Sequence, residues 1–350
     1  MMIQYAYQVR FNTPAFLGNA EQAGQWRTPP FKALLRQWWR VAYAAGRHQQ
    51  PDLVTEMRQE ENRLFGTATD DREGSRKSLV RLRLDRWSIG SMKSWASLGT
   101  VNHPETPFPV GSDLYLGYGP LTLPKGAKEP RLKANAAIQT GELATLSLAF
   151  PAGEEGRLKQ ALSLMQLYGT LGGRSRNGWG SLRLHPNDDK VPALADSLAS
   201  SNIRNWQDCL DQDWPHAIGE DETGPLIWQT VDHGDWKALM TTLAKLKIGL
   251  RTQFLFHPGK NAKTPEARHW LSYPVTNHSV SSWDRNARLP NSLRFKVRQA
   301  ADGKLYGLIV HLPCQPPASF KPDLRVIKDT WKKVYRFLDQ KEHVLSRSPA

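Results

Sequence analysis

The chain has 350 residues, 39% of them hydrophobic, which is enough to bury the cores of two joined domains. Lys and Arg number 47 against 33 Asp and Glu, and the formal charge of +14 favours a polyanionic partner, most often nucleic acid. Cys209 and Cys314 lie far apart without metal-ligand spacing, so we predict no metal site, no disulfide scaffold and no cofactor. The sequence has no long apolar run and no signal-like N-terminus, so we expect a cytoplasmic protein without a membrane partner.

The first predicted elements are a strand and a helix. Residues 3–11 alternate apolar with polar or small side chains, the pattern of a half-buried strand. A helix is expected to begin here, with Thr28 as its N-cap and Pro29 at its first helical position. The face opposite its apolar stripe carries Lys32, Arg36, Arg40 and, at its margin, Trp39. Such a face fits either a solvated surface or a polyanion-binding surface beside an aromatic side chain.

The next predicted elements lead to a glycine-rich loop. Residues 80–84 and 144–150 alternate as strands, and residues 154–168 form a helix with a buried apolar stripe. This helix continues into LYGTLGGRSRNGWGSL, residues 167–182, where glycines permit close approach of a ligand and arginines can bind phosphate. The residues that we predict to face RNA in this loop are Gly172, Gly173, Arg174, Ser175, Arg176, Asn177, Gly178 and Trp179. The glycines are equally explained by a tight passage from helix to strand.

The order strand, helix, strand, strand, helix, strand in residues 1–190 indicates a ferredoxin-like domain. Residues 191–223 are expected to form a connector with an acidic patch. A similar order begins again in residues 224–350, although no clear last strand is visible. The predicted fold class is therefore α+β, with tandem ferredoxin-like (RRM-like) domains and long inserted loops.

Two further expectations concern the inserted segments and the strand cations. The Gly-, Pro- and Lys-rich segment 90–141 is expected to contain one short strand, at residues 114–118. In the second domain, Arg294, Lys296 and Arg298 alternate with apolar residues and should point away from the core. These cations fit either protection of a sheet edge or binding of RNA.

The sequence shows no catalytic or metal-binding constellation. His48, just beyond the first helix, could act as an acid or base in RNA cleavage, although a plain surface position explains it as well. Asp70 and Asp71 lie in the loop 66–78 and could assist attack by a ribose hydroxyl or hold a metal, or simply be solvated. The same loop contains Arg76 and Lys77, which we predict to contact RNA.

Three segments together carry a resemblance to a known family: FNTPAFLGNAEQAGQWRTPPFKALLRQWWRVAYA at residues 11–44, LFG with a basic loop ending at Ser78, and the glycine-rich loop 167–182. The chain resembles the RAMP superfamily of CRISPR-associated proteins, and within it the Cmr-type subunit that caps the filament of a type III-B effector complex. The family motif falls on Thr13-Pro14, Arg27, the Lys32 to Arg40 helix and Gly172 to Gly180. The sequence departs from it at Asn177, often an arginine, and at Gly173, often an alanine.

The resemblance implies a non-catalytic RNA-binding subunit that contacts crRNA near its 3′ region and the paired target RNA, beside neighbouring RAMP subunits. It implies phosphate contacts for the cations and either base stacking or core packing for the two tryptophans. The residues given these roles are Arg27, Lys32, Arg36, Arg40, Arg174 and Arg176, with Trp39 and Trp179.

Three other functions remain open from the sequence alone. The chain could be a RAMP-type endoribonuclease that processes precursor crRNA, with chemistry at His48 or in the loop 66–78. It could be a filament-forming RAMP subunit of another CRISPR type, such as type IV. It could also be a protein scaffold whose basic faces contact acidic protein partners.

Overall fold

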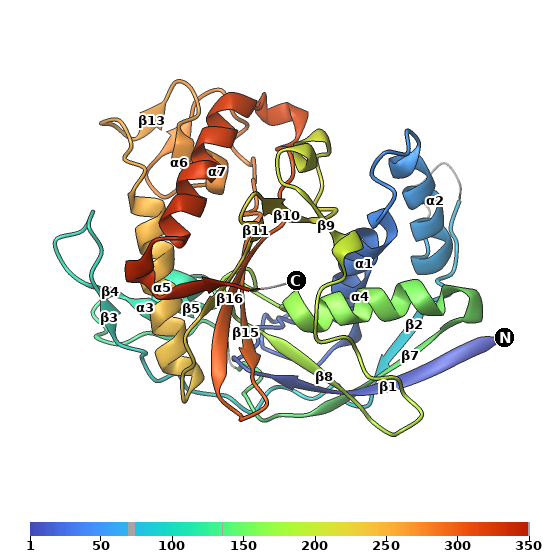
Figure 1. The fold of residues 1–350 in the computed structure, drawn as a ribbon. Coiled ribbons are helices and arrows are strands. Elements are labelled where there is room, and N and C mark those ends of the chain that lie inside the picture. The colour runs from blue at the N-terminus through green and yellow to red at the C-terminus, as the bar shows by residue number, and fades with distance from the viewer. Residues whose placement is uncertain (69–73, 135, 349–350) are drawn as a thin grey trace.

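The computed structural model describes residues 1–68, 74–134 and 136–348, so the candidate acids Asp70 and Asp71 lie outside the described residues. The described residues form two four-stranded antiparallel sheets with helices packed against them (Figure 1). This mixed architecture of helices and antiparallel sheets agrees with the predicted fold class. In the same residues, no helix is long and apolar enough to cross a lipid bilayer.

The first sheet is built from residues of the first half of the chain. Its strands are β1 (Met2–Phe11), β2 (Arg81–Leu84), β7 (Ala144–Pro151) and β8 (Leu182–Pro186), in the spatial order β2-β7-β1-β8. The alternation of β1 buries every second side chain beneath α1 (Thr28–Ala44) and α4 (Glu155–Tyr168), which lie side by side above the sheet (Figure 1). The helix α1 begins at Thr28, one residue earlier than expected, so Arg27 rather than Thr28 is its N-cap.

The second sheet repeats this arrangement. Its strands are β12 (Ile227–Thr230), β15 (Leu293–Gln299), β16 (Leu305–His311) and β17 (Leu345–Arg347), in the order β15-β16-β12-β17. The helices α5 (Trp236–Thr252) and α7 (Leu324–Leu338) connect its strands, and each begins with an aspartate that caps the first turn. Both sheets therefore place their sequential strands in the order second, third, first, fourth.

Shorter elements fill the connections. The further helices are α2 (Leu53–Phe65), α3 (Ser112–Gly117) and α6 (Ala267–Leu271), with 3₁₀ turns at 152–154, 200–202, 208–211, 318–320 and 341–343. The further strands are β3 (Thr100–Val101), β4 (Val110–Gly111), β5 (Leu121–Thr122), β6 (Arg131–Leu132), β9 (Ile203–Asn205), β10 (Ile218–Asp221), β11 (Gly224–Pro225), β13 (Asn261–Ala262) and β14 (Ser279–Val280).

Three local expectations are wrong or incomplete. Residues 112–117 form α3, whereas a strand was predicted at 114–118. The polar segment 53–65 is the helix α2, which the sequence did not reveal because it lacks a broad apolar stripe. The last strand of the second sheet does exist, as β17, but it has only three residues and pairs with β12.

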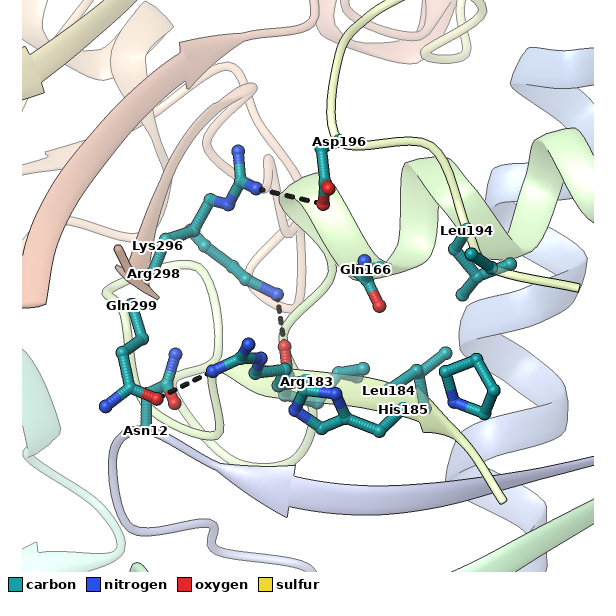
Figure 2. Close-up of a pocket in the computed structure, with 13 residues that line it drawn as sticks. Asn12, Gln166, Arg183, Leu184, His185, Leu194, Asp196, Lys296, Arg298 and Gln299 are labelled. Atoms are coloured by element: carbon teal, nitrogen blue, oxygen red, sulfur yellow. Dashed lines mark hydrogen bonds and ion pairs between the residues drawn. The ribbon is translucent and has the colours of Figure 1, made fainter. Parts of the chain in front are cut away.

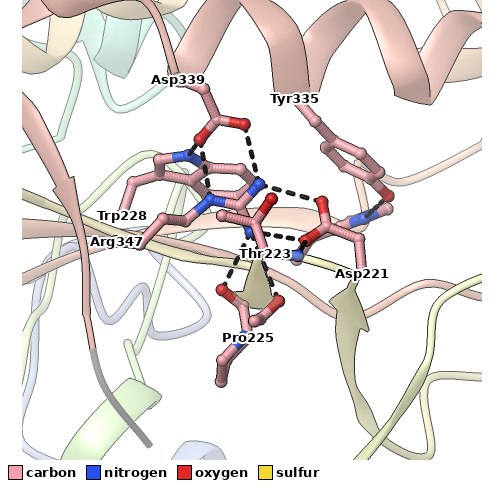
Figure 3. Close-up of polar contacts among 9 residues, drawn as sticks. Asp221, Thr223, Pro225, Trp228, Tyr335, Asp339 and Arg347 are labelled. Atoms are coloured by element: carbon pink, nitrogen blue, oxygen red, sulfur yellow. Dashed lines mark hydrogen bonds and ion pairs between the residues drawn. The ribbon is translucent and has the colours of Figure 1, made fainter.

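The strand β17 is fixed by one arginine (Figure 3). The guanidinium of Arg347 pairs with Asp221 at 3.0 Å and with Asp339 at 2.7 Å, and it donates to the carbonyl of Pro225 at 3.1 Å. Its carbon lies 4.4 Å from the centre of the Trp228 ring. Because these partners come from β10, β11, β12 and the end of α7, this side chain holds the C-terminal strand against four other segments.

The two sheets share a continuous contact, here called the seam, formed by β15 against residues 169–182 and Asn12. The amide of Phe295 donates to the carbonyl of Arg176 at 3.0 Å, and the amide of Val297 donates to Ser181 Oγ at 2.8 Å. In the opposite direction, Asn12 Nδ2 donates a hydrogen bond to the carbonyl of Val297 at 2.9 Å. The glycine-rich loop thus covers the free edge of β15, and the edge carries no open row of donors at these positions.

Candidate nucleic-acid interface

The glycine-rich loop is shaped by its own protein contacts. Gly172 has φ +95°, and a Cβ there would lie 2.6 Å from the carbonyl oxygen of Phe16. Gly180 has φ +64°, and its Cβ would lie 1.9 Å from the carbonyl oxygen of Leu171. Cβ atoms at Gly173 and Gly178 would lie 2.8 Å from Pro120 and 3.3 Å from Met240. The tight passage of the chain therefore accounts for these glycines.

Some polar side chains of the loop form hydrogen bonds with the protein, and others are exposed. Arg174 is exposed, with φ +56°, and its Nε donates to the carbonyl of Tyr118 at 2.5 Å. Asn177 donates to the carbonyl of Leu116 at 2.6 Å and accepts from Lys247 Nζ on α5. Ser175 and Arg176 are partly buried. The loop is consequently rigid in its backbone while its two arginines line a hollow.

That hollow and a second one adjoin each other along the seam, and together we call them the seam groove. They have volumes of about 960 Å³ and 770 Å³ and share Tyr118, Arg174, Asn177 and Lys247 in their linings. The walls come from the glycine-rich loop, α5 and the segment 272–294 in the larger hollow, and from residues 103–118, α5 and residues 255–278 in the smaller. The groove is therefore a joint product of both halves of the chain.

The larger hollow is lined by cations without acids. Among the described residues, its lining contains five Lys or Arg side chains and no Asp or Glu: Arg174, Arg176, Lys247, Arg288 and Arg294. The smaller hollow adds Arg251 and Arg268, of which Arg268 is paired with Glu105 at 2.5 Å. An anion entering the larger hollow would meet fixed positive charge on several sides.

Burial weakens the charged state of several groove cations. The pKa of Arg294, which is 5% exposed, falls to about 9 because burial penalises its charge and Arg176 repels it. The pKa of Lys247 lies well below its usual value, first through burial and then through repulsion from Arg251 and Arg174. Within the described part of the chain, Arg294 Nε also has no hydrogen-bond partner. An unpaired buried cation is unfavourable, and a bound anion would relieve the penalty.

The cationic face of α1 lies outside the seam groove, and some of its cations already have protein partners. Glu61 on α2, 2% exposed, pairs with Arg36 and, at 2.8 Å, with Arg40. Lys32 Nζ donates to the carbonyl of Phe65 at 2.9 Å, and burial lowers its pKa. Arg27 is partly buried at the start of the helix. That these cations bind RNA stays a prediction, and the structure does not bring them into the seam groove, to which α1 contributes Gln37.

The remaining predicted residues are dispersed. Trp39 and Trp179 are fully buried, so for both the core-packing alternative describes the structure. Trp179 packs between Phe16, 5.4 Å away, and Trp95, 5.5 Å away, measured between ring centres. Arg76 and Lys77 are exposed beside the undescribed part of their loop. None of these four side chains lines the two hollows of the seam groove as described.

His48 occupies a partly enclosed position. Its ring centre lies 5.3 Å from that of His216, and neither ring nitrogen has a hydrogen-bond partner among the described residues. Burial and repulsion from His216 lower the pKa of His48 to about 4, so its ring is neutral at pH 7. No group of three or more His, Cys, Asp or Glu able to hold a metal occurs in the described residues.

The expected exposure of the β15 cations is wrong for two of them. Arg294 and Lys296 are 5% and 1% exposed. Lys296 crosses the seam and donates to the carbonyl of Leu182 at 2.7 Å (Figure 2). It also donates to the carbonyl of Gly169 at 2.6 Å. Arg298 lies partly exposed beside a smaller pocket and approaches Asp196 at 3.9 Å. Alternation predicted outward side chains correctly, but the first half of the chain covers that side of the strand.

Sequence reasoning missed several groove residues, among them Lys247, Arg288 and Tyr118. Lys247 follows Lys245 on a helix whose apolar stripe gives no sign that one lysine turns toward the loop. Arg288 lies in the long segment between α5 and β15, where the sequence offers charge but no placement. Tyr118 was assigned to a strand that does not form.

Comparison with known proteins gives the following. Residues 11–183 match the family model of the RAMP superfamily. No curated protein matches the chain. The apo crystal structure of Cmr1 from Pyrococcus furiosus aligns at 13% identity over 98% of both chains, with a TM-score of 0.43. A chain in a cryo-EM structure of the type III-B Cmr-beta bound to cognate target RNA aligns at 11% identity over 97% of this chain and 100% of that chain, with a TM-score of 0.49. Through residues 11–183, the chain belongs to the RAMP superfamily.

Proposed function

We propose that this chain is a non-catalytic RNA-binding subunit of a multisubunit CRISPR effector complex and that it binds the RNA phosphate backbone in the seam groove. One observation carries the proposal: five cations line the larger hollow, and no acid of the described residues does. RNA phosphates supply the counter-charge that Arg294 and Lys247 lack. The formal charge of +14 favours the same class of ligand.

The finer assignment follows the sequence resemblance. In this proposal the complex is of type III-B, the RNA is crRNA near its 3′ region with paired target RNA, and the subunit caps the filament beside other RAMP subunits. Guide RNA in such complexes is held through its backbone and shape while base pairing reads its sequence. A groove lined by four arginines and a lysine suits recognition through the backbone.

We also infer that residues 1–190 and 224–350 are two ferredoxin-like domains joined by the connector 191–223. The shared strand order of the two sheets supports this inference. The two hydrophobic cores exchange residues, since Val310 and Leu312 pack with the first core and Trp179 with the second. In this proposal the two domains therefore form one body, and the groove between them is preorganised.

The proposal is tested by the salt dependence of RNA binding. If each of the five cations neutralises one phosphate, the slope of log K against log salt for single-stranded RNA is about −3.5. The variant Arg174→Gln with Arg288→Gln removes two exposed cations, and its slope should fall to about −2.1 with weaker binding throughout. The matched control is Arg81→Gln with Arg83→Gln, two exposed arginines on β2 that do not line the groove. An unchanged slope in the groove variant, or an equal change in the control, rejects the seam groove as the RNA site.

A further inference from the structure

Tyr118 presents an aromatic ring to the middle of the seam groove. It is 65% exposed, although it sits among buried neighbours at the end of α3. It lines both hollows, at the point where they adjoin. Among the described residues its ring has no aromatic neighbour within stacking distance and its hydroxyl has no hydrogen-bond partner. Most of this side chain is therefore open to solvent at the groove.

The backbone beneath this ring is firmly held. The amide of Tyr118 donates to the carbonyl of Leu114 at 2.8 Å, and its own carbonyl accepts from Arg174 Nε at 2.5 Å. The amide of Gly119 donates to the carbonyl of Leu121 at 3.0 Å, with Gly119 at φ +118°. Ordering this residue on binding therefore loses little backbone entropy, because the backbone is ordered already.

Cations flank the ring on the same surface. Arg174 and Lys247 line both hollows together with Tyr118, and Arg251 lines the smaller one. An exposed aromatic ring between cations matches the way single-stranded nucleic acid is bound, with phosphates on the charges and an unstacked base on the ring. In an A-form duplex the bases are stacked inside the helix, where this ring cannot reach them.

Building on the proposed function, we infer that Tyr118 stacks on a nucleotide base and that the seam groove takes an unpaired, single-stranded stretch of the RNA at this point. The ring supplies the sequence-tolerant part of the binding, since every base offers a flat face. Arg174 contributes in two ways, because its Nε supports the Tyr118 backbone and the residue lines both hollows.

The test uses the full chain and a fluorescein-labelled single-stranded RNA of about 12 nucleotides carrying an internal 2-aminopurine. Anisotropy gives the affinity, and quenching of 2-aminopurine reports stacking. The variant Tyr118→Ala should bind about tenfold more weakly and lose the quenching, whereas Tyr118→Phe keeps both. Trp87→Ala, which removes an exposed aromatic residue that does not line the groove, is the control and should match wild type. The same RNA annealed to its complement should bind more weakly than the single strand.

The outcomes separate this inference from the proposed function. If Arg174→Gln with Arg288→Gln weakens binding but Tyr118→Ala does not, the groove binds RNA and the stacking role is rejected. Equal affinity for the duplex and the single strand rejects the single-stranded ligand. If the arginine variant leaves binding unchanged, the proposed function fails, and the role of Tyr118 fails with it.

Discussion

The cluster of Arg36, Arg40 and Glu61 makes a quantitative prediction about the face of α1 that the sequence predicts to bind RNA. Glu61 is 2% exposed and accepts from both arginines, whose side chains are each 38% exposed. Removing both cations leaves a buried carboxylate without a counter-ion. Breaking a buried ion pair in this way lowers stability by about 3–5 kcal/mol.

The magnitude expected here is at the lower end. Solvent reaches the outer side of both guanidinium groups and screens the interaction. We therefore expect Arg36→Gln with Arg40→Gln to lower the free energy of unfolding by about 2–3 kcal/mol. Adding Glu61→Gln removes the buried charge and leaves one buried amide, so the triple variant should be only about 1 kcal/mol less stable than wild type.

Urea unfolding followed by tryptophan fluorescence measures these differences. The exposed pair Arg81→Gln with Arg83→Gln serves as control and should change stability by less than about 0.5 kcal/mol. A double variant as stable as the control, or a triple variant less stable than the double, refutes the reasoning. The stable triple variant also tests RNA binding by α1. If both arginines contact phosphates, its salt slope is smaller by about 1.4, and an unchanged slope removes α1 from the binding surface.

Two further predictions concern the second sheet. His311 is fully buried between Ser292 Oγ at 2.8 Å and the Tyr335 hydroxyl at 2.7 Å, and burial lowers its pKa to about 3. Because the unfolded chain takes up this proton below about pH 6.5 and the folded chain does not, stability is lost as pH falls. The advantage of wild type over His311→Gln should shrink by about 2–3 kcal/mol between pH 7 and pH 4.5, and a constant difference in urea unfolding contradicts this. The variant Arg347→Lys replaces a guanidinium that bridges two aspartates with a single ammonium group. It should lower the free energy of unfolding by about 2 kcal/mol. A loss below about 0.5 kcal/mol in urea unfolding would show that the bridging geometry is unimportant.

The sequence predicted correctly those helices and strands whose apolar residues recur regularly over many positions. The alternation of β1, the proline near the start of α1 and the apolar stripe of α4 all lie where the sequence placed them, to within a residue or two. The loop 167–182 was correctly placed between a helix and a strand. These features depend on residues a few positions apart, so one sequence is enough to find them.

The errors arise where distant segments decide the outcome. Lys296 alternates like an exposed residue, yet Gly169 and Leu182, more than a hundred positions earlier, accept its hydrogen bonds. Glu61 belongs to a polar segment, and only the packing of α2 on α1 turns it inward. The seam groove could not be predicted for the same reason, because Arg174 and Arg294 come from different halves of the chain.

The glycine-rich loop therefore has two roles that place different demands on its residues. Its glycines and Ser181 hold the loop in place. Gly172 and Gly180 lie too close to neighbouring backbone atoms for a Cβ, and Ser181 Oγ accepts a hydrogen bond from the Val297 amide. Its arginines, Arg174 and Arg176, line the larger hollow, and their side chains make few contacts with the rest of the fold. Substitutions at the glycines should consequently disturb folding before binding. Substitutions at Arg174, whose side chain bonds the fold at the Tyr118 carbonyl, should mainly disturb binding. In the proposed function, RNA contact then depends on how β15 holds the loop, because the seam fixes the backbone of the loop that carries Arg174 and Arg176.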